Sequence, residues 1–595
     1  MLRHLQGWGA RVAALTALAA LTAAAGLAPA SATASTTAST TQDTLTVKAT
    51  NLKGQPDANG TMQLWSVDNT TSLTGPQAYQ KFVNGRATFQ LPAGHYFAVA
   101  TFGSTGPTKH PVPLRYVVIP QLNVAKNQTL SVAETQASSE VTMATPRPAT
   151  ALDTDVELKR TGTKGPAIVL EFYNFAPEWF SPANAKPSVG TFRMAVNQHL
   201  ESPAGSGVPY EYTLSYLDSP GIIPSQHYVA SAKDLATVHE RFYQPVKATG
   251  GWALPGSLPG TSPNKNKDWF GFAEPAGPAL TLPGQLTEYV GGPSTMEWTG
   301  EYQPASGTPW AASNARLLHP GENLTENWSA LPLHTAANVL LEPESNMFGA
   351  TLPSASRRGN TLTLAVDPFD DNQPGHVIGW LGSSSAAKVA GTYQVDRNGT
   401  KIAGGNAVSK IPGPDGEFYT KVALNSAKAS TVRFALHVTR AGAGYPLSNA
   451  IDTAWTWRTT PAGAAKAPAG WTCVLYQRVS NCAVQPMMTL QYAVAGLSLH
   501  GAAQAGRQVL HVSVGHLQAA KASGIARAAV SVSFDGGTTW HRTQVTGTGG
   551  HYTAAFTAPA GTKVTLRTSA SDAAGATITE TIANAYQIAN SHQLA

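Results

Sequence analysis

Cysteine and charge are both scarce in this sequence. Cys473 and Cys482 are its two cysteines, and Asp, Glu, Lys and Arg make up 12% of the 595 residues. A cysteine-only zinc site needs four ligands, so we expect these two cysteines to form a disulfide, as paired cysteines do in exported proteins. No Lys/Arg cluster stands out along the chain, and the basic patch that nucleic-acid binding requires is therefore not predicted.

Catalytic signatures are missing as well. The chain has no G-x-S-x-G elbow, no H-E-x-x-H zinc helix and no phosphate-binding loop. Two stretches imitate parts of a subtilisin site, LDSPGIIPSQH around Asp218 and GPSTM around Ser294, but Pro220 interrupts the first and no His-Gly-Thr segment accompanies them. A serine nucleophile needs an aligned base. We therefore predict no catalytic residues and no enzymatic activity.

The long apolar run of this sequence lies at its N-terminus. Residues Val12 to Leu27 follow Arg3 and Arg11 and lead into the small-residue series that ends at Ala32. This pattern is typical of a signal peptide, which we place at residues 1–32, followed by a flexible Ser/Thr-rich leader at 33–43. Because the chain has neither a lipid-attachable cysteine nor an apolar C-terminal tail, we expect a secreted protein without a membrane anchor.

Short alternating segments between Gly/Pro turns dominate the remainder. Thr44–Ala49, Thr361–Val366, Thr431–Val438 and Val509–Val514 are examples, and period-two alternation predicts half-buried strands. We therefore predict a mainly β protein of tandem β-sandwich domains. The expected units are a sandwich at 44–140, a linker at Val141–Asp153, a loop-rich β domain at 155–331, a β-sandwich at 332–482 and an immunoglobulin- or fibronectin-like sandwich at 483–588.

One helix is expected within these units. Ser231 and Asp234 resemble a capping box, and Leu235, Val238 and Phe242 fall on one face of a helix over Ser231–Tyr243.

The sequence SFDGGTTW in the last unit matches the Asp-box pattern. Its members are Ser533, Asp535, Gly537 and Trp540. Glycine tolerates positive φ and an aspartate side chain accepts hydrogen bonds from turn amides. We therefore expect a structural turn in which Trp540 packs across the hairpin.

Two further motifs have open interpretations. Asp367, Asp370 and Asp371 place carboxylates close together, either as a calcium site or as a solvated turn, and no other cofactor is indicated. Trp455 and Trp457 are two residues apart, so on a strand they share a face. They either stack on a sugar ring or line a sandwich core.

Several ordered blocks resemble known families. LPAGHYFAVA resembles the prealbumin-like, carboxypeptidase-regulatory type of domain. A longer series resembles the C-terminal extension of secreted actinobacterial subtilisin-like serine proteases: IIPSQHYVASAKDLATVHERFY, GQLTEYVGGPSTMEW, PGHVIGW, TAWTWRT, ARAAVSVSFDGGTTW and VTLRTSASDAAGATITETIANAY. In those proteases the chemistry belongs to a subtilase domain that this chain lacks, so the resemblance implies accessory β-sandwich material without catalytic residues.

These observations together predict a secreted, non-enzymatic accessory protein. Its partner would be another extracellular protein or a component of the cell envelope. Two alternatives remain, a carbohydrate-binding protein and a serine peptidase-related hydrolase with an unrecognised site.

Overall fold

A computed structural model describes residues 42–590 apart from several short segments. These segments are 74, 76–77, 104–111, 184–185, 219–220, 255, 258–278, 293–295, 304–309, 314–315, 338, 342–350, 380–387, 409–417, 427, 443, 462, 464 and 475–478. The expected signal peptide and residues 33–41 of the expected leader lie outside the described residues. Gln42 and Asp43 already belong to the first strand, β1 (Gln42–Thr50).

The described residues form β-structure almost throughout. Beside the strands they contain two single-turn 3-10 helices, Glu134–Gln136 and Ala232–Asp234, and no α-helix. None of the helices in this part of the chain has the length and apolar character needed to cross a membrane. The predicted mainly β class with several sandwich-like sheets is confirmed.

The N-terminal unit is a sandwich of two sheets. Its further strands are β2 (Thr61–Ser66), β3 (Tyr79–Lys81), β4 (Arg86–Pro92), β5 (Gly94–Phe102), β6 (Leu114–Val124), β7 (Gln128–Ala133), β8 (Ser139–Glu140) and β12 (Glu178–Phe180). The sheets run β4-β1-β7 and β3-β2-β5-β6-β12-β8. Alternation explains the strands: Leu45 and Val47 of β1 are buried while Lys48 is exposed. Strand β12 comes from beyond residue 140, so the expected unit 44–140 is completed by the following region.

A seven-stranded sheet follows in the order β11-β10-β13-β14-β20-β16-β25. Its strands are β10 (Thr150–Arg160), β11 (Ile168–Asn174), β13 (Phe192–Glu201), β14 (Tyr210–Asp218), β16 (Ala236–Phe242), β20 (Gly284–Gly291) and β25 (Asn323–Trp328). The linker expected at Val141–Asp153 is wrong, because it contains β9 (Thr142–Ala144), which pairs with β15 (His227–Val229), and the start of β10. Val99 and Tyr116 share one core with Val156 and Met194, so this sheet packs directly on the N-terminal sandwich.

The expected helix at Ser231–Tyr243 is also wrong. Residues 232–234 form one 3-10 turn and residues 236–242 form strand β16. Ala236, Val238, Glu240 and Phe242 are all buried, which is period two rather than the helical period. The alternation was concealed because a glutamate occupies one of the buried positions.

Two small sheets cover the core face of the seven-stranded sheet. Their strands are β17 (Ala248–Ala253), β18 (Gly256–Ser257), β19 (Ala279–Leu282), β21 (Glu297–Trp298), β22 (Glu301–Gln303), β23 (Trp310–Ser313), β24 (Arg316–Leu317) and β31 (His376–Gly379). The orders are β19-β17-β22-β23-β31 and β18-β21-β24. Trp252, Trp298 and Trp328 fill the space between these sheets and the seven-stranded sheet. A separate hairpin pairs β27 (Val339–Leu341) with β28 (Thr351–Pro353).

The C-terminal lobe contains a nine-stranded sheet. Its strands are β32 (Lys388–Arg397), β33 (Thr400–Asn406), β35 (Thr431–Ala441), β36 (Ala450–Arg458), β39 (Ala502–Ala503), β41 (Ile525–Ser533), β42 (His541–Arg542), β45 (Lys563–Asp572) and β46 (Thr577–Ile588). They run in the order β33-β32-β35-β36-β46-β45-β41-β42, and β39 pairs beside β46.

Two further sheets pack against the inner face of the nine-stranded sheet. The five-stranded sheet contains β26 (His334–Ala336), β29 (Ala355–Arg358), β30 (Thr361–Asp370), β34 (Phe418–Ala423) and β37 (Ala483–Val484). The four-stranded sheet contains β38 (Met488–Val494), β40 (Gly506–His516), β43 (Gln544–Thr548) and β44 (His551–Ala558). One core runs from Leu331 to Ile588. The expected boundary between residues 482 and 483 therefore falls inside one lobe.

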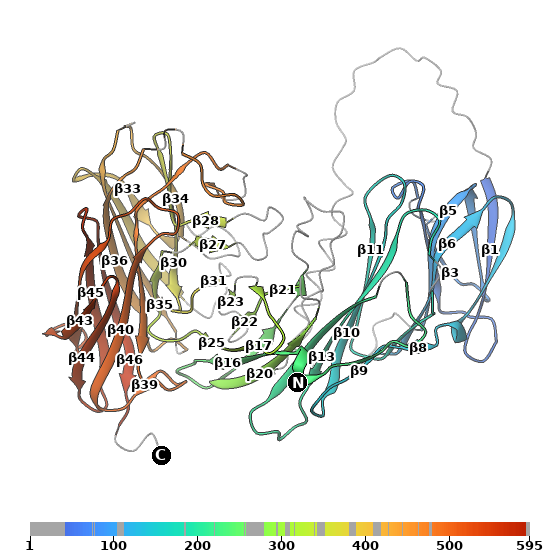
Figure 1. Ribbon diagram of the computed structural model, residues 1–595, viewed down its shortest axis with the longest axis horizontal. Helices are drawn as coiled ribbons and strands as arrows, with labels where there is room; N and C mark the ends of the chain where they lie inside the picture. Colours follow the sequence, from blue (N-terminus) through green and yellow to red (C-terminus); the bar gives the residue numbers. More distant parts are fainter. Residues whose placement is uncertain are drawn as a thin grey trace, which may run out of the picture.

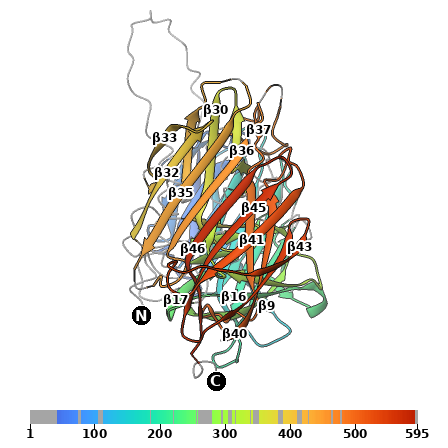
Figure 2. The same cartoon turned by 90° about the vertical axis from the view of Figure 1, so that its left-hand side faces the viewer.

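Figure 1 shows the N-terminal sandwich at one end of the molecule and the C-terminal lobe at the other, with strands of the seven-stranded sheet between them. Figure 2 looks onto the outer face of the nine-stranded sheet, where β32, β35, β36, β46 and β45 lie side by side.

The expected disulfide is confirmed: Cys473 and Cys482 are bonded, with their Cα atoms 6.2 Å apart.

Candidate functional site

A row of mostly small side chains crosses the outer face of the nine-stranded sheet. Residues directly opposite one another on neighbouring strands line up across a sheet. From β33 to β41 the register aligns Gly404, Gln394, Ala435, Ala454, Thr579, Ser569 and Ala529. Seven strands at the usual spacing make this row about 29 Å long.

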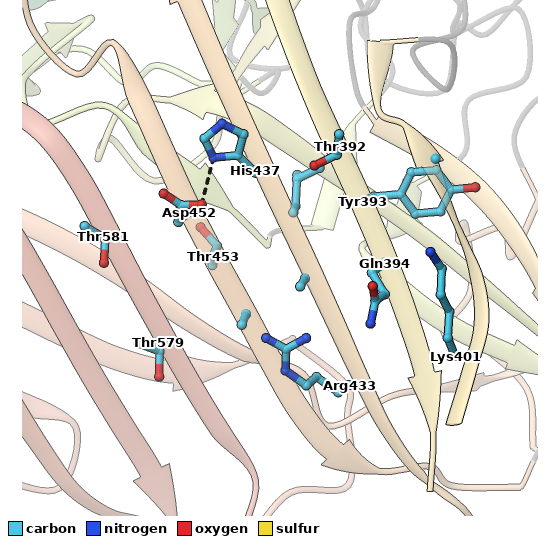
Figure 3. Close-up of a pocket in the computed structure, with 14 residues that line it drawn as sticks. Thr392, Tyr393, Gln394, Lys401, Arg433, His437, Asp452, Thr453, Thr579 and Thr581 are labelled. Carbon is cyan, nitrogen blue, oxygen red and sulfur yellow. Dashed lines mark hydrogen bonds and ion pairs between the residues drawn. The ribbon is translucent and has the colours of Figure 1, made fainter. Parts of the chain in front are cut away.

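Polar and charged side chains stand in the rows on either side. One row contains Thr392, His437, Asp452, Thr581 and Arg567, and the other contains Asp396, Arg433, Thr456, Thr577, Ser571 and Arg527. Between β33 and β46 the small row is the floor of a groove, and the two flanking rows are its walls. Between β33 and β46 the groove forms a hollow of about 430 Å³, drawn in Figure 3.

Charged groups shape this hollow. In one wall, Nδ1 of His437 lies 2.7 Å from Oδ1 of Asp452, and both side chains are largely exposed. In the other wall, Nη1 of Arg433 lies 3.6 Å from Oδ2 of Asp396. The Lys401 side chain passes over Gly404, which has no side chain of its own. A Cβ added to Gly404 would lie only 2.8 Å from Cε of Lys401. Lys401 therefore covers this end of the floor. Figure 3 shows Gln394 between Lys401 and Arg433.

The Asp box lies at the end of β41 on the same sheet. The Ser533 hydroxyl donates to Oδ1 of Asp535 at 2.6 Å, and the Thr539 amide donates to the same oxygen at 2.8 Å. These hydrogen bonds lower the pKa of Asp535 to about 2. Gly536 and Gly537 both have positive φ, 73° and 96°. These residues thus form a hydrogen-bonded turn.

Trp540 differs from its expected role as an anchor across the hairpin. Its ring is only partly buried, and the guanidinium of Arg567 lies 3.8 Å from the ring centroid. Arg567 belongs to one of the two rows that flank the small row. The indole therefore supports a cation on the outer face.

Replacing Trp540 by alanine should lower the free energy of unfolding of the C-terminal lobe by about 1 kcal/mol, the worth of a partly exposed cation–π contact. A fully buried tryptophan would cost about 3–5 kcal/mol. Urea unfolding measures the difference, with Trp540→Phe as the control that keeps an aromatic ring under Arg567. A loss in the larger range for Trp540→Ala would show that the indole is a core residue after all.

Trp455 and Trp457 lie on the inner face of β36, beneath the groove floor. Both are buried, Trp455 stacks on Phe434 at 5.2 Å, and its Nε1 donates to the Met488 carbonyl at 3.0 Å. Of the two interpretations of this pair, the sandwich core is confirmed and the sugar platform is wrong.

The three aspartates near residue 370 do not form a solvated turn. Asp367 and Asp370 lie in β30, Asp371 follows it, and all three are buried. Burial raises the pKa of Asp367 well above its ordinary value, which disfavours the ionised carboxylate that a calcium ion binds. Within the described ranges, no three His, Cys, Asp or Glu side chains are placed to hold a metal ion.

Asp371 instead belongs to a buried ion-pair chain. His376 donates through Nδ1 to Oδ2 of Asp371 at 3.0 Å and through Nε2 to Oε1 of Glu326 at 3.2 Å, and Arg316 donates to both oxygens of Glu326. The imidazole also stacks on Trp328 at 4.0 Å. Burial opposes its charge, but Asp371 and Glu326 outweigh burial and raise the pKa of His376 to about 9.

The same sheet face buries two pairs of glutamates that the sequence did not reveal. Glu211 lies opposite Glu288, and Glu240 lies opposite Glu326, on neighbouring parallel strands. Burial raises the pKa values of Glu211, Glu288 and Glu240, and the partner carboxylate raises those of Glu211 and Glu240 further. Burial therefore disfavours the ionised form of these three side chains.

The subtilisin-like stretches are not assembled into a site by the described residues. His227 is exposed on β15, where its Nδ1 lies 2.9 Å from the Thr142 hydroxyl, and Asp218 ends β14. Ser294 lies outside the described residues.

Comparisons with known proteins assign no family. No family model matches the chain, and no curated protein matches it. Among solved structures, the TIE protein of Bacillus anthracis aligns over 48% of this chain and 50% of its own length, with 9% identity and a TM-score of 0.10. A putative membrane-anchored protein from Corynebacterium diphtheriae aligns over 75% of this chain and 98% of its own, with 10% identity and a TM-score of 0.12. Scores this low carry no argument about fold or function.

Proposed function

We propose that this chain is a secreted, non-enzymatic protein that binds an extended polymer of the cell envelope in the groove of the nine-stranded sheet. The observation that carries the proposal is the row of small side chains, which forms an exposed floor between two polar walls. The row of small side chains that contains this floor is about 29 Å long and crosses the strands, which suits a linear ligand better than a small molecule.

Two features of the chain support the compartment and the absence of chemistry. The Cys473–Cys482 disulfide fits an oxidising environment outside the cytoplasm. The sequence has no triad or zinc motif, and the resemblance to accessory regions of secreted proteases implies β-sandwich material without catalytic residues. A serine peptidase-related hydrolase remains the alternative, while carbohydrate binding is a special case of the proposed function.

Filling the groove should abolish binding. In the double variant Ala435→Ile/Ala454→Ile, two bulky side chains without charge stand on the floor, and isoleucine is well accepted in strands. We expect at least tenfold weaker co-sedimentation with isolated actinobacterial cell walls. Ala441→Ile is the matched control, because Ala441 is exposed on the same strand and face, beyond the groove. Equal retention of the double variant and the wild type would contradict the proposal.

A further inference from the structure

We infer that the groove selects an anionic polysaccharide, a sugar polymer that carries carboxylate or phosphate groups. This inference rests on the proposed function and names its ligand class. It follows from three properties of the outer face: its charge, the placement of that charge, and the donors that its floor and walls offer.

The outer face is strongly basic, although the chain as a whole is nearly balanced. Residues two apart on a strand point to the same side of a sheet, so the outward positions can be read from the alternation of β32 to β46. Two acidic side chains point outward there, Asp396 and Asp452. The basic ones number seven among the described side chains: Lys401, Arg433, Arg458, Arg527, Arg542, Lys563 and Arg567. Over the full sequence the numbers are 40 basic and 34 acidic residues.

The positive charge is divided between the two ends of the row of small side chains. Lys401 and Arg433 stand on β33 and β35, whereas Arg567 and Arg527 stand on β45 and β41. Arg433 and Arg527 occupy the same cross-strand row, four strand spacings apart, which is about 19 Å. Only a ligand with repeated negative charges reaches both ends.

The part of the groove between these ends is neutral and rich in hydroxyl groups. Thr456, Thr577, Thr579 and Thr581 stand around Ala454 on β36 and β46. Threonine hydroxyls both donate and accept hydrogen bonds, as sugar hydroxyls do. This stretch therefore matches the uncharged part of a sugar chain between two acidic groups.

The main chain of a peptide would find few free hydrogen-bonding partners on this surface. Extended peptides bind sheets at their edges, where main-chain groups are free. On the face of the sheet, the main chains of β35, β36 and β46 are paired with neighbours on both sides. The ligand must therefore be recognised through side chains.

Stacking contributes little, which separates this groove from a single-stranded nucleic-acid site. Such sites stack bases on exposed aromatic side chains. The one aromatic residue lining the hollow, Tyr393, packs its ring inward at 5.1 Å from Phe418. Trp540, at the other end, is already covered by Arg567. Charge and hydroxyl contacts thus dominate recognition.

Binding should be measured by isothermal titration of the full chain with five defined probes. These are polygalacturonate, a glycerol-phosphate polymer, neutral dextran, poly-L-glutamate and a single-stranded DNA oligomer. We expect polygalacturonate, the phosphate polymer or both to bind, and to bind at least tenfold more weakly when salt is raised from 0.05 to 0.5 M, because salt screens exposed charges. The carboxylate and phosphate probes distinguish the two sources of negative charge.

The double variant Arg433→Gln/Arg567→Gln removes one cation near each end of the row of small side chains. We expect it to weaken binding at least tenfold, while Lys48→Gln/Lys81→Gln on the N-terminal sandwich, which removes the same charge, leaves binding unchanged. Equal affinity for poly-L-glutamate or DNA would overturn the polysaccharide assignment. Salt-independent binding of dextran would overturn the anionic ligand but leave the proposed function intact. No binding of any probe, together with cell-wall binding unaffected by groove filling, would overturn both.

Discussion

Replacing His376 by glutamine is expected to lower the free energy of unfolding by about 3–5 kcal/mol, the usual cost of removing one partner from a buried ion pair. His376 lies between Asp371, which follows a strand of the C-terminal lobe, and Glu326 at the edge of the seven-stranded sheet. Glutamine keeps hydrogen-bonding capacity but no positive charge. Two carboxylates would then remain buried with only Arg316 to compensate them.

The matched control is His437→Gln, which removes the same side chain from an exposed pair with Asp452. Exposed pairs contribute about 0–1 kcal/mol, so this variant should be nearly neutral in urea unfolding. Similar losses for both variants would show that the buried chain does not hold the two regions together.

The contribution of His376 should also depend on pH. Its pKa rises from 6.5 in the unfolded chain to about 9 in the folded protein. A group with a raised folded pKa binds its proton more tightly when folded, so the stabilisation is complete below pH 6.5 and is lost as pH rises through 9. The difference between wild type and His376→Gln should therefore shrink between pH 7 and pH 10.

Glu178 should produce the opposite result, with a substitution that stabilises the protein at alkaline pH. Its carboxyl group is fully buried beside Tyr116, whose hydroxyl donates to Oε1 at 3.1 Å. Burial raises the pKa of Glu178 from 4.5 to about 8. The folded state therefore loses stability as pH rises from 4.5 through 8, because an ionised carboxylate must be kept away from water.

Glu178→Gln removes this penalty. The interval from 4.5 to about 8 corresponds to at most about 5 kcal/mol, so we expect the variant to be several kcal/mol more stable than wild type at pH 8.5 and similar to it at pH 4.5. Thermal unfolding across this range measures the effect. Glu140→Gln on the adjacent strand β8 is the control, since Glu140 is exposed. A constant difference between Glu178→Gln and wild type at every pH would contradict the assignment.

Most strands could be predicted because their alternation is a local property. Thr431–Val438 and Val509–Val514 alternate cleanly, and both lie within strands. The pattern failed where a polar residue takes a buried position. Glu240 hid the alternation of β16. Glu211, between the buried Tyr210 and Tyr212, is buried as well, so β14 shows no alternation of apolar and polar residues there.

The candidate site could not be predicted, because its floor has no chemical signature. Gly404, Ala435, Ala454, Ser569 and Ala529 are ordinary small residues from five strands, and only the register brings them into one row. The basic side chains around them are spread over about 170 residues, so they form no Lys/Arg cluster along the sequence. In contrast, the Asp box and the disulfide are local, and both were predicted.

Strand β46 completes the nine-stranded sheet from its middle. It lies between β36 and β45, although it is the last strand along the described chain. A nascent chain emerges N-terminus first, so β36 and β45 stay unpaired on these sides until residue 588 has left the ribosome or an export channel. Unpaired strand edges readily join other chains. The lobe therefore has to be protected from aggregation during this interval. Truncation before residue 577, by proteolysis or by a stop codon, would remove β46. It would leave two open sheet edges rather than a shorter folded lobe.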